Sequence, residues 1–168
     1  MLDMESWKKS GESRMRLAGR GQAAFLLAQV GAHAASRFGE RLKRLKLIPA
    51  HAGIMRILGA RQGMTQQALA ETLGMFPSRL VALLDELESR GLIERRASQE
   101  DRRRYALHLT EEGNSMLVNI GLVAREHQQA LLAALSQDEQ GQLADLLQRV
   151  ADEQGLTRGV HPGYARIR

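Results

Sequence analysis

The chain has 168 residues, 43% of them hydrophobic, which is enough for one domain with a sizeable core and an appended element for self-association. It contains no cysteine, which excludes disulfide frameworks, thiolate metal sites and thiol redox switches. Its formal net charge of +5 favours an anionic partner, and the excess of basic residues lies in the first two thirds of the chain.

The N-terminal segment lacks the apolar core that a secretion signal needs. No later segment approaches the roughly 20 apolar residues of a membrane span. We therefore expect a cytoplasmic protein.

The first 20 residues mix charged side chains with Ser and Gly and show no sustained period, which predicts a flexible N-terminal arm. An alternative is a basic arm that contacts the phosphates of a nucleic acid. The next segment, residues 21–45, is rich in Ala and places Leu27, Val30, Ala34, Phe38 and Leu42 three or four residues apart. This spacing predicts an amphipathic helix.

A short second helix is predicted from Pro49, which suits the first turn of a helix, to the region of Gly59. A third helix begins after Thr65, whose hydroxyl can cap the free N–H groups, and ends at Gly74, which can adopt positive φ. Pro77 then favours the first turn of a fourth helix. The third and fourth helices together predict a helix-turn-helix.

The fourth helix has one apolar stripe, formed by Leu80, Leu83, Leu84 and Leu87 at the spacing i, i+3, i+4 and i+7. At 100° per residue the opposite face presents Ser78, Ala82 and Asp85, with Arg79 and Val81 on its flanks. These flank and outward positions are the candidates for reading bases.

A β-hairpin follows, with a first strand over residues 92–96 and a return strand that points Tyr105, Leu107 and Leu109 inward. Its tip is basic. Five arginines lie between positions 95 and 104 and outnumber Glu100 and Asp101; they are Arg95, Arg96, Arg102, Arg103 and Arg104. A cationic hairpin beside a helix-turn-helix is typical of a wing that contacts phosphates or the minor groove.

Two further amphipathic helices are predicted after the hairpin. Thr110 caps a helix of about six turns or more, and the capping box from Ser136 to Glu139 starts another. Gly and Pro residues end regular structure in the tail, residues 155–168. The helices outside the helix-turn-helix carry more apolar surface than a small domain can cover, so we expect a homodimer. The predicted interface residues are Leu27, Leu131, Leu135, Leu143, Leu146, Leu147 and Val150.

The run over residues 80–95, the Asp-x-Arg of Asp101 and Arg103, and the closing LHLTEEG before the long helix resemble the multiple antibiotic resistance regulator (MarR) family. The resemblance implies a mostly α fold with a small β-hairpin wing: a winged helix-turn-helix flanked by N- and C-terminal dimerisation helices. It assigns residues 21–154 to one domain, with a DNA-binding lobe at 46–110 and dimerisation helices at 21–45 and 111–154. It also implies that Arg103 enters the minor groove and pairs with Asp101, or that Asp101 pairs with a neighbouring arginine.

The residues and the resemblance together predict a transcriptional regulator that binds a pseudo-palindromic operator in double-stranded DNA. Repression, relieved by a small apolar or aromatic effector, is the expected mode. The predicted DNA contacts are Thr65, Gln66, Ser78, Arg79, Val81, Ala82, Arg95, Arg102, Arg103 and Arg104. His33 and His51 are candidates for lining an effector pocket.

The alternative function is a winged helix that docks a protein partner through the apolar residues Phe76, Val81 and Ala82. The five histidines are dispersed and give no ligand spacing, so we expect no metal. No nucleophile elbow, phosphate loop or paired carboxylate motif is present, which argues against an enzyme and predicts no cofactor.

Overall fold

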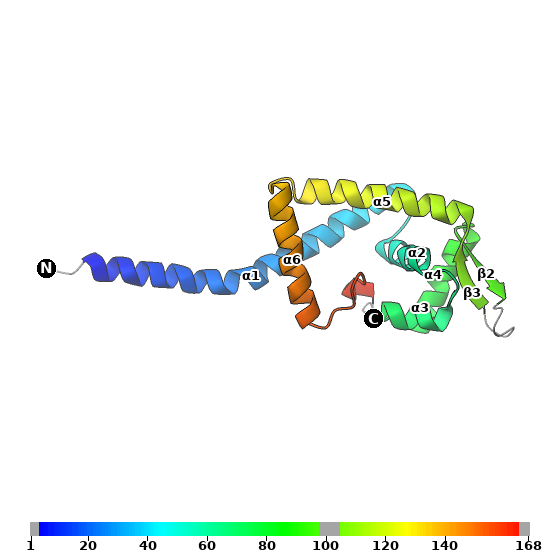
Figure 1. Cartoon of the computed structure of the whole chain (residues 1–168), viewed down its shortest axis with the longest axis horizontal. Coiled ribbons are helices and arrows are strands. Elements are labelled where there is room, and N and C mark those ends of the chain that lie inside the picture. The colour runs from blue at the N-terminus through cyan, green and yellow to red at the C-terminus, as the bar shows by residue number, and fades with distance from the viewer. Residues whose placement is uncertain (1–3, 98–104, 165–168) are drawn as a thin grey trace. The chain divides into compact units, whose positions relative to one another are not determined.

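The computed structural model describes residues 4–97 and 105–164, with only the backbone given for residues 4–21. The chain divides into two compact units, residues 1–37 and residues 38–168, and each is described by itself. In chain order the elements are α1 (Met4–Leu42), η1 (Lys43–Leu45), α2 (Pro49–Ala60), β1 (Met64–Thr65), α3 (Gln66–Leu73), α4 (Pro77–Ser89), β2 (Ile93–Ala97), β3 (Tyr105–Leu109), α5 (Glu111–Leu131), α6 (Gln137–Glu153) and η2 (Pro162–Tyr164). Figure 1 shows their arrangement.

Helix α1 contains the predicted amphipathic helix but begins much earlier. Residues 1–20 were expected to form an arm without regular structure, whereas the backbone from Met4 onward is helical. The segment has no proline to interrupt a helix, and its Met, Glu, Lys, Arg and Ala residues have favourable helix propensity. This part of α1 was not predicted, because its mixture of charged residues and Gly gives no apolar stripe in the sequence. At the other end, Lys46 takes a left-handed φ of 54° and closes the helical run.

The second unit is built on α2, α3 and α4 beside a small antiparallel sheet with strand order β1-β3-β2 (Figure 1). The sheet contributes Ile93, Leu107 and Leu109 to the hydrophobic core. Met55 of α2 is fully buried in the same core. Tyr105 was predicted to point inward, but it is 60% exposed because it lies at the far end of β3, opposite Ala97 and away from the core. Strand β1 was not predicted, since two residues are too few for a period-2 pattern.

The helix-turn-helix forms as its capping residues predict. The Thr65 hydroxyl accepts a hydrogen bond from the Ala68 N–H over 3.2 Å and so caps α3. Gly74 takes a φ of 61° at the end of α3, and Pro77 occupies the first turn of α4. The stripe of four leucines on α4 is buried, as predicted: Leu80, Leu83, Leu84 and Leu87.

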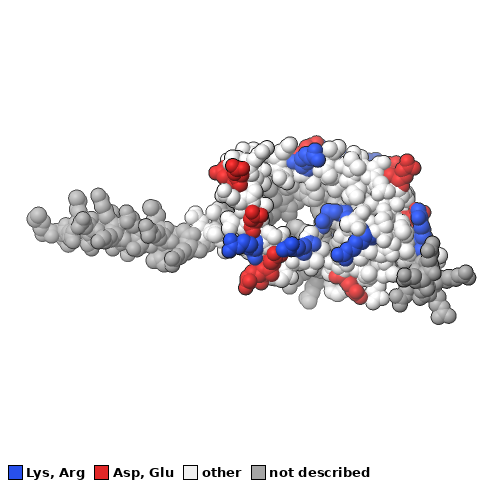
Figure 2. Space-filling view, viewed as in Figure 1, with Lys and Arg blue, Asp and Glu red and all other residues white. Residues whose placement is uncertain are grey.

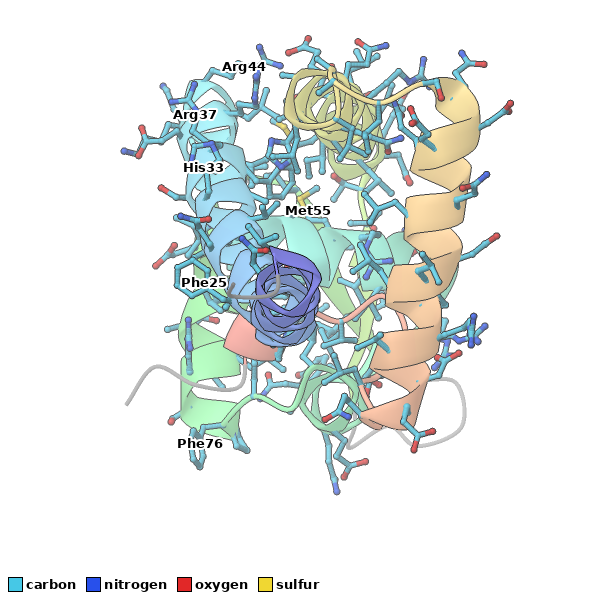
Figure 3. The ribbon with its side chains drawn as sticks, turned by 90° about the vertical axis from the view of Figure 1, so that its left-hand side faces the viewer. Phe25, His33, Arg37, Arg44, Met55 and Phe76 are labelled. Carbon is cyan, nitrogen blue, oxygen red and sulfur yellow. The ribbon has the colours of Figure 1, made fainter. Side chains whose placement is uncertain are left out.

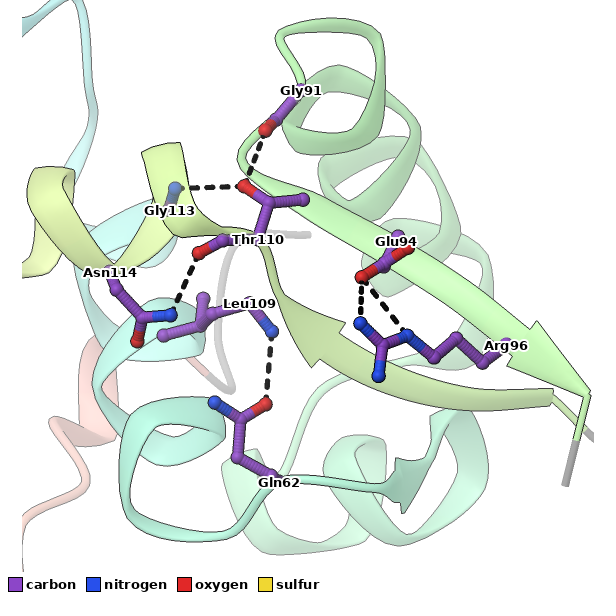
Figure 4. Close-up of polar contacts among 8 residues, drawn as sticks. All are labelled: Gln62, Gly91, Glu94, Arg96, Leu109, Thr110, Gly113 and Asn114. Carbon is purple, nitrogen blue, oxygen red and sulfur yellow. Dashed lines mark hydrogen bonds and ion pairs between the residues drawn. The ribbon is translucent and has the colours of Figure 1, made fainter. Parts of the chain in front are cut away.

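Thr110 joins the sheet to α5 through three hydrogen bonds, which Figure 4 shows. Its hydroxyl donates to the Gly91 carbonyl over 2.6 Å and accepts from the Gly113 N–H over 2.9 Å. Its carbonyl accepts from the Asn114 amide over 2.8 Å. Gly113 packs so tightly that a Cβ on it would lie 1.9 Å from the Leu92 carbonyl oxygen. The start of α5 is therefore fixed against the end of α4.

Helix α5 ends at Leu131, and a turn separates it from α6. Ser136 and Glu139 form the predicted capping box, which determines where α6 begins. No residue of α6 is buried within this single chain. Among the helices that the structure describes, none is long and apolar enough to cross a membrane.

Candidate nucleic-acid interface

The outward face of α4 is polar and small, as the helix period predicts. Ser78 and Ala82 are exposed, and Val81 beside them is partly buried. Phe76, the residue that precedes α4, is 64% exposed and projects away from the body of the molecule (Figure 3). An α-helix with short side chains on its free face can approach another surface closely. The face therefore suits insertion into a groove.

The start of α3 lies next to the sheet, and a surface cavity of about 320 Å³ opens between them. It is lined by Thr65, Gln66 and Gln67 from the α3 side and by Arg95, Tyr105 and Leu107 from the sheet. The Thr65 hydroxyl is already used as the cap of α3. Gln66 is only partly buried and no hydrogen bond of its side chain is seen among the described residues, so its amide is free to meet a ligand at this edge.

Arg95 has a role that the sequence did not predict. Its guanidinium donates to Asp85 of α4 over 2.6 Å and also contacts Glu88 one turn further along the same helix. The Arg95 side chain is 23% exposed, which is low for an arginine on a strand near the surface. In this structure Arg95 connects β2 to α4. Its predicted contact with DNA stays a prediction.

Of the remaining wing arginines, Arg96 lies within the described residues. Arg96 on β2 is exposed and its Nε donates to Glu94 over 3.0 Å (Figure 4). The predicted contacts Arg102, Arg103 and Arg104 and the predicted partner Asp101 lie outside the described residues. The pairing of Asp101 with Arg103 therefore stays a prediction.

Arg79 on the flank of α4 faces the C-terminal segment, which we define as residues 155–164. Its Nη1 donates to the carbonyl oxygen of Tyr164 over 3.3 Å, and the side chain is partly buried. Arg79 thus differs from Ser78 and Ala82, which are exposed on the same helix. The sequence pattern could place Arg79 on the flank but could not show which segment covers it.

His51 of α2 lies beneath α4 and is 4% exposed. Its Nδ1 accepts a long hydrogen bond of 3.5 Å from the Ile48 N–H, so the ring proton belongs on Nε2. Nε2 is 3.1 Å from the Glu86 carboxylate. The geometry of the N–H does not meet that of a hydrogen bond, so the contact with Glu86 is mainly electrostatic. Burial lowers the pKa of His51 from 6.5; Glu86 opposes this shift and Arg90 adds to it.

The suggested effector pocket gains no support from His51, because its ring is enclosed between α2 and α4 and faces Glu86. His33 lies on α1 in the unit before Phe38, where its side chain is exposed. A role for these two histidines in binding an effector stays a prediction.

Most of the predicted interface residues on α6 are exposed in the single chain. Leu146, Leu147 and Val150 are exposed by 55%, 39% and 49%, and Leu27 on α1 is also exposed. Leu131, Leu135 and Leu143 are partly buried. Figure 2 shows basic and acidic side chains interspersed on one face, with several basic ones in its middle.

Known proteins share both the sequence and the fold of this chain. A sequence model of the MarR family matches residues 45–104, which cover the helix-turn-helix and part of the wing. The transcriptional repressor CouR, solved bound to a 23-mer DNA duplex, is 31% identical with a TM-score of 0.68. That match covers 76% of this chain and 91% of CouR. The chain belongs to the MarR family.

Two further relatives extend the comparison. A protein of Thauera aromatica assigned to transcriptional regulation of the hcr operon is 37% identical over 98 residues, which cover 58% of this MarR-family chain. The match spans only 59% of that relative. Wild-type MarR from E. coli has a TM-score of 0.69 at 23% identity, covering 76% of this chain and 94% of that one, and shows the fold alone.

The comparisons confirm the predicted family and fold class, a mostly helical winged helix-turn-helix. Members of the MarR family are transcriptional regulators and not enzymes, so the prediction that the chain is not an enzyme is also confirmed.

Proposed function

We propose that this chain is a homodimeric, sequence-specific DNA-binding regulator of transcription, and that it represses its target until a small-molecule effector releases it. The observation that carries the proposal is the free face of α4. Ser78 and Ala82 are exposed on a helix whose other side is fixed in the core by four buried leucines. A rigid helix that presents short side chains can enter a major groove, with Ser78 near its N-terminal end.

The wing supports the same proposal. Strand β2 packs against α4 through Arg95, and Arg96 is exposed on the same strand. The sequence that joins β2 to β3 carries three more arginines. Arginines at such a position can bind phosphates or enter a narrow minor groove next to the site that the helix reads. The structure of CouR on a DNA duplex is a precedent within the same fold.

The dimer is part of the proposal because one helix-turn-helix binds weakly. Two copies of α4 can occupy successive major-groove faces only if a symmetric body holds them about 34 Å apart. The exposed apolar residues of α6 offer a surface from which such a body can be built, and α1 carries exposed apolar residues of its own. Small molecules that change the separation of the two α4 helices would then change DNA affinity.

A winged helix that docks a protein partner is the second candidate. The observation that favours it is Phe76, a large apolar side chain that is 64% exposed beside α4. The two candidates respond differently to salt. Binding that neutralises phosphates weakens steeply as salt rises, with a slope of about −0.9 per phosphate on a log-log plot. Apolar docking does not weaken in this way.

The test is to select bound duplexes from a random DNA library and measure affinity by fluorescence anisotropy over a range of salt concentrations. We expect a preferred sequence and a steep negative slope. Ser78→Glu is the matched variant: an acidic residue in the first turn of α4 favours the helix but repels DNA in the groove. DNA affinity should collapse while thermal stability is kept. Binding that shows no sequence preference and no salt dependence would overturn the proposal.

A further inference from the structure

The C-terminal segment is fitted closely to the helix-turn-helix. Val160 and Tyr164 pack against the buried core of the second unit. The Tyr164 ring lies directly on the backbone of α2 at Gly53, where an added Cβ would be 2.6 Å from the ring atom Cε2. Only glycine permits this approach. Burial raises the pKa of Tyr164 above its usual 10, although Arg56 opposes the shift, so the phenol stays neutral at physiological pH.

Further contacts fix the path of the segment before Tyr164. Arg158 forms an ion pair with Asp152 at the end of α6 over 2.7 Å. Gly159 takes a φ of 72° and passes under Arg56, where an added Cβ would lie 2.8 Å from Nη1. The His161 ring lies 5.6 Å from the Tyr164 ring, centre to centre. These contacts lead the chain back from α6 to the face formed by α2 and α4.

The segment ends on Arg79, the cationic residue nearest the N-terminal end of α4. The Tyr164 carbonyl accepts a hydrogen bond of 3.3 Å from Arg79 Nη1, and the Arg79 side chain is partly buried there. In helix-turn-helix proteins the N-terminal end of this helix lies closest to the DNA. The C-terminal segment therefore holds the one arginine of α4 whose position suits a DNA contact.

We propose that the C-terminal segment is a latch that holds Arg79 away from the DNA backbone, and that undocking the segment frees this guanidinium to bind a phosphate. This inference rests on the proposed DNA-binding function. A guanidinium binds an anionic phosphate more strongly than a neutral carbonyl. Docking of the segment and binding of the phosphate compete for the same side chain, so each weakens the other.

The key variant is Gly53→Ala, which undocks the Tyr164 ring without changing any charge. Alanine in place of a glycine inside a helix favours the helix, so the variant should stay folded. We expect affinity for the selected duplex to rise on the order of tenfold at low salt. The log-log salt slope should steepen by about 0.9, the value for one added phosphate contact. Gly121→Ala on α5 is the control, because an added Cβ there meets nothing within 4 Å.

Tyr164→Ala provides an independent route, since it removes the ring but leaves every basic residue of the chain in place. It should reproduce both the higher affinity and the steeper slope. Adding Arg79→Ala to either variant should abolish both changes. A gain that persists without Arg79, or unchanged or weaker DNA binding after undocking, would overturn the latch. Failure of the wild-type chain to bind any duplex would instead overturn the proposed function.

Discussion

Arg95 of β2 and Asp85 of α4 form an ion pair of 2.6 Å that ties the wing strand to the helix proposed to enter the groove. Glu88 contacts the same guanidinium. The pair therefore does two things at once. It fixes β2 relative to α4, and it neutralises acidic groups on the helix that is proposed to enter the groove.

Arg95→Ala should lower DNA affinity even though Arg95 need not contact DNA. The variant exposes the carboxylates of Asp85 and Glu88 without their partner, and they repel phosphates. We expect a loss of roughly tenfold at low salt and a loss of stability of about 1 kcal/mol or less, since Asp85 is 59% exposed and solvent screens the pair. Anisotropy and urea unfolding measure the two effects.

The control adds Asp85→Asn and Glu88→Gln to Arg95→Ala. If the carboxylates cause the loss, neutralising them should restore most of the affinity. If affinity stays low in the triple variant, Arg95 binds DNA directly, as the sequence suggested.

Gly113→Ala should destabilise the fold although alanine is the better helix former. The added Cβ would lie 1.9 Å from the Leu92 carbonyl oxygen, which is backbone and cannot rotate away. The expected loss is about 1–3 kcal/mol, the usual range for overpacking. Gly121→Ala in the same helix meets no neighbour and should gain up to about 1 kcal/mol. Equal shifts in the urea midpoints of the two variants would contradict the close packing at Gly113.

The contacts that could be predicted from the sequence are the local ones. Thr65, Gly74, Pro77 and Ser136 act through backbone groups within a few residues, so their identity and spacing were enough to locate helix ends. The leucine stripe of α4 could be predicted for the same reason, because its residues lie close together in the sequence. The family resemblance then supplied the order in which these elements pack.

The contacts that could not be predicted join residues far apart in the chain. Arg79 and Tyr164 are separated by 85 positions, and nothing in either neighbourhood indicates the other. The sequence likewise could not show that Arg95 faces Asp85 and Glu88, since this depends on how β2 crosses α4. The extension of α1 to Met4 was missed for a different reason, because a helix without an apolar stripe has no periodic pattern.

Protonation of His51 should destabilise the protein at acidic pH. Burial lowers its pKa in the folded state below 6.5, so the unfolded chain binds a proton more readily. The contribution of this group to stability is complete above about pH 6.5 and is lost as pH falls toward the lowered folded-state pKa.

The variant His51→Gln separates this effect from general acid denaturation. Glutamine cannot titrate, but its amide oxygen can still accept the hydrogen bond from the Ile48 N–H. Between about pH 7.5 and about pH 5.5 the urea midpoint of the wild type should fall more than that of the variant. Parallel pH profiles for the two proteins would show that His51 does not titrate in this range.

Leu147→Asp should convert the proposed dimer to a monomer. Leu147 is 39% exposed on α6 in the single chain, and the aspartate would place an unpaired charge in an apolar contact. We expect analytical ultracentrifugation to show a monomer and operator affinity to be lost, with weak binding to any duplex retained. Gln148→Asp, on the next position of the same helix, adds the same charge and serves as the control. A Leu147 variant that remains dimeric on its operator would assign the interface elsewhere.

Helix α6 has no buried residue within one chain. This has a consequence for how the occupancy of a target site depends on the concentration of the protein. If α6 is covered only by a second copy, the competent species forms in proportion to the square of the protomer concentration when protomers are scarce. Occupancy of a target site would then rise more steeply than the amount of protein made. A modest fall in synthesis could empty the site without any change in the affinity of the reading helix for its bases.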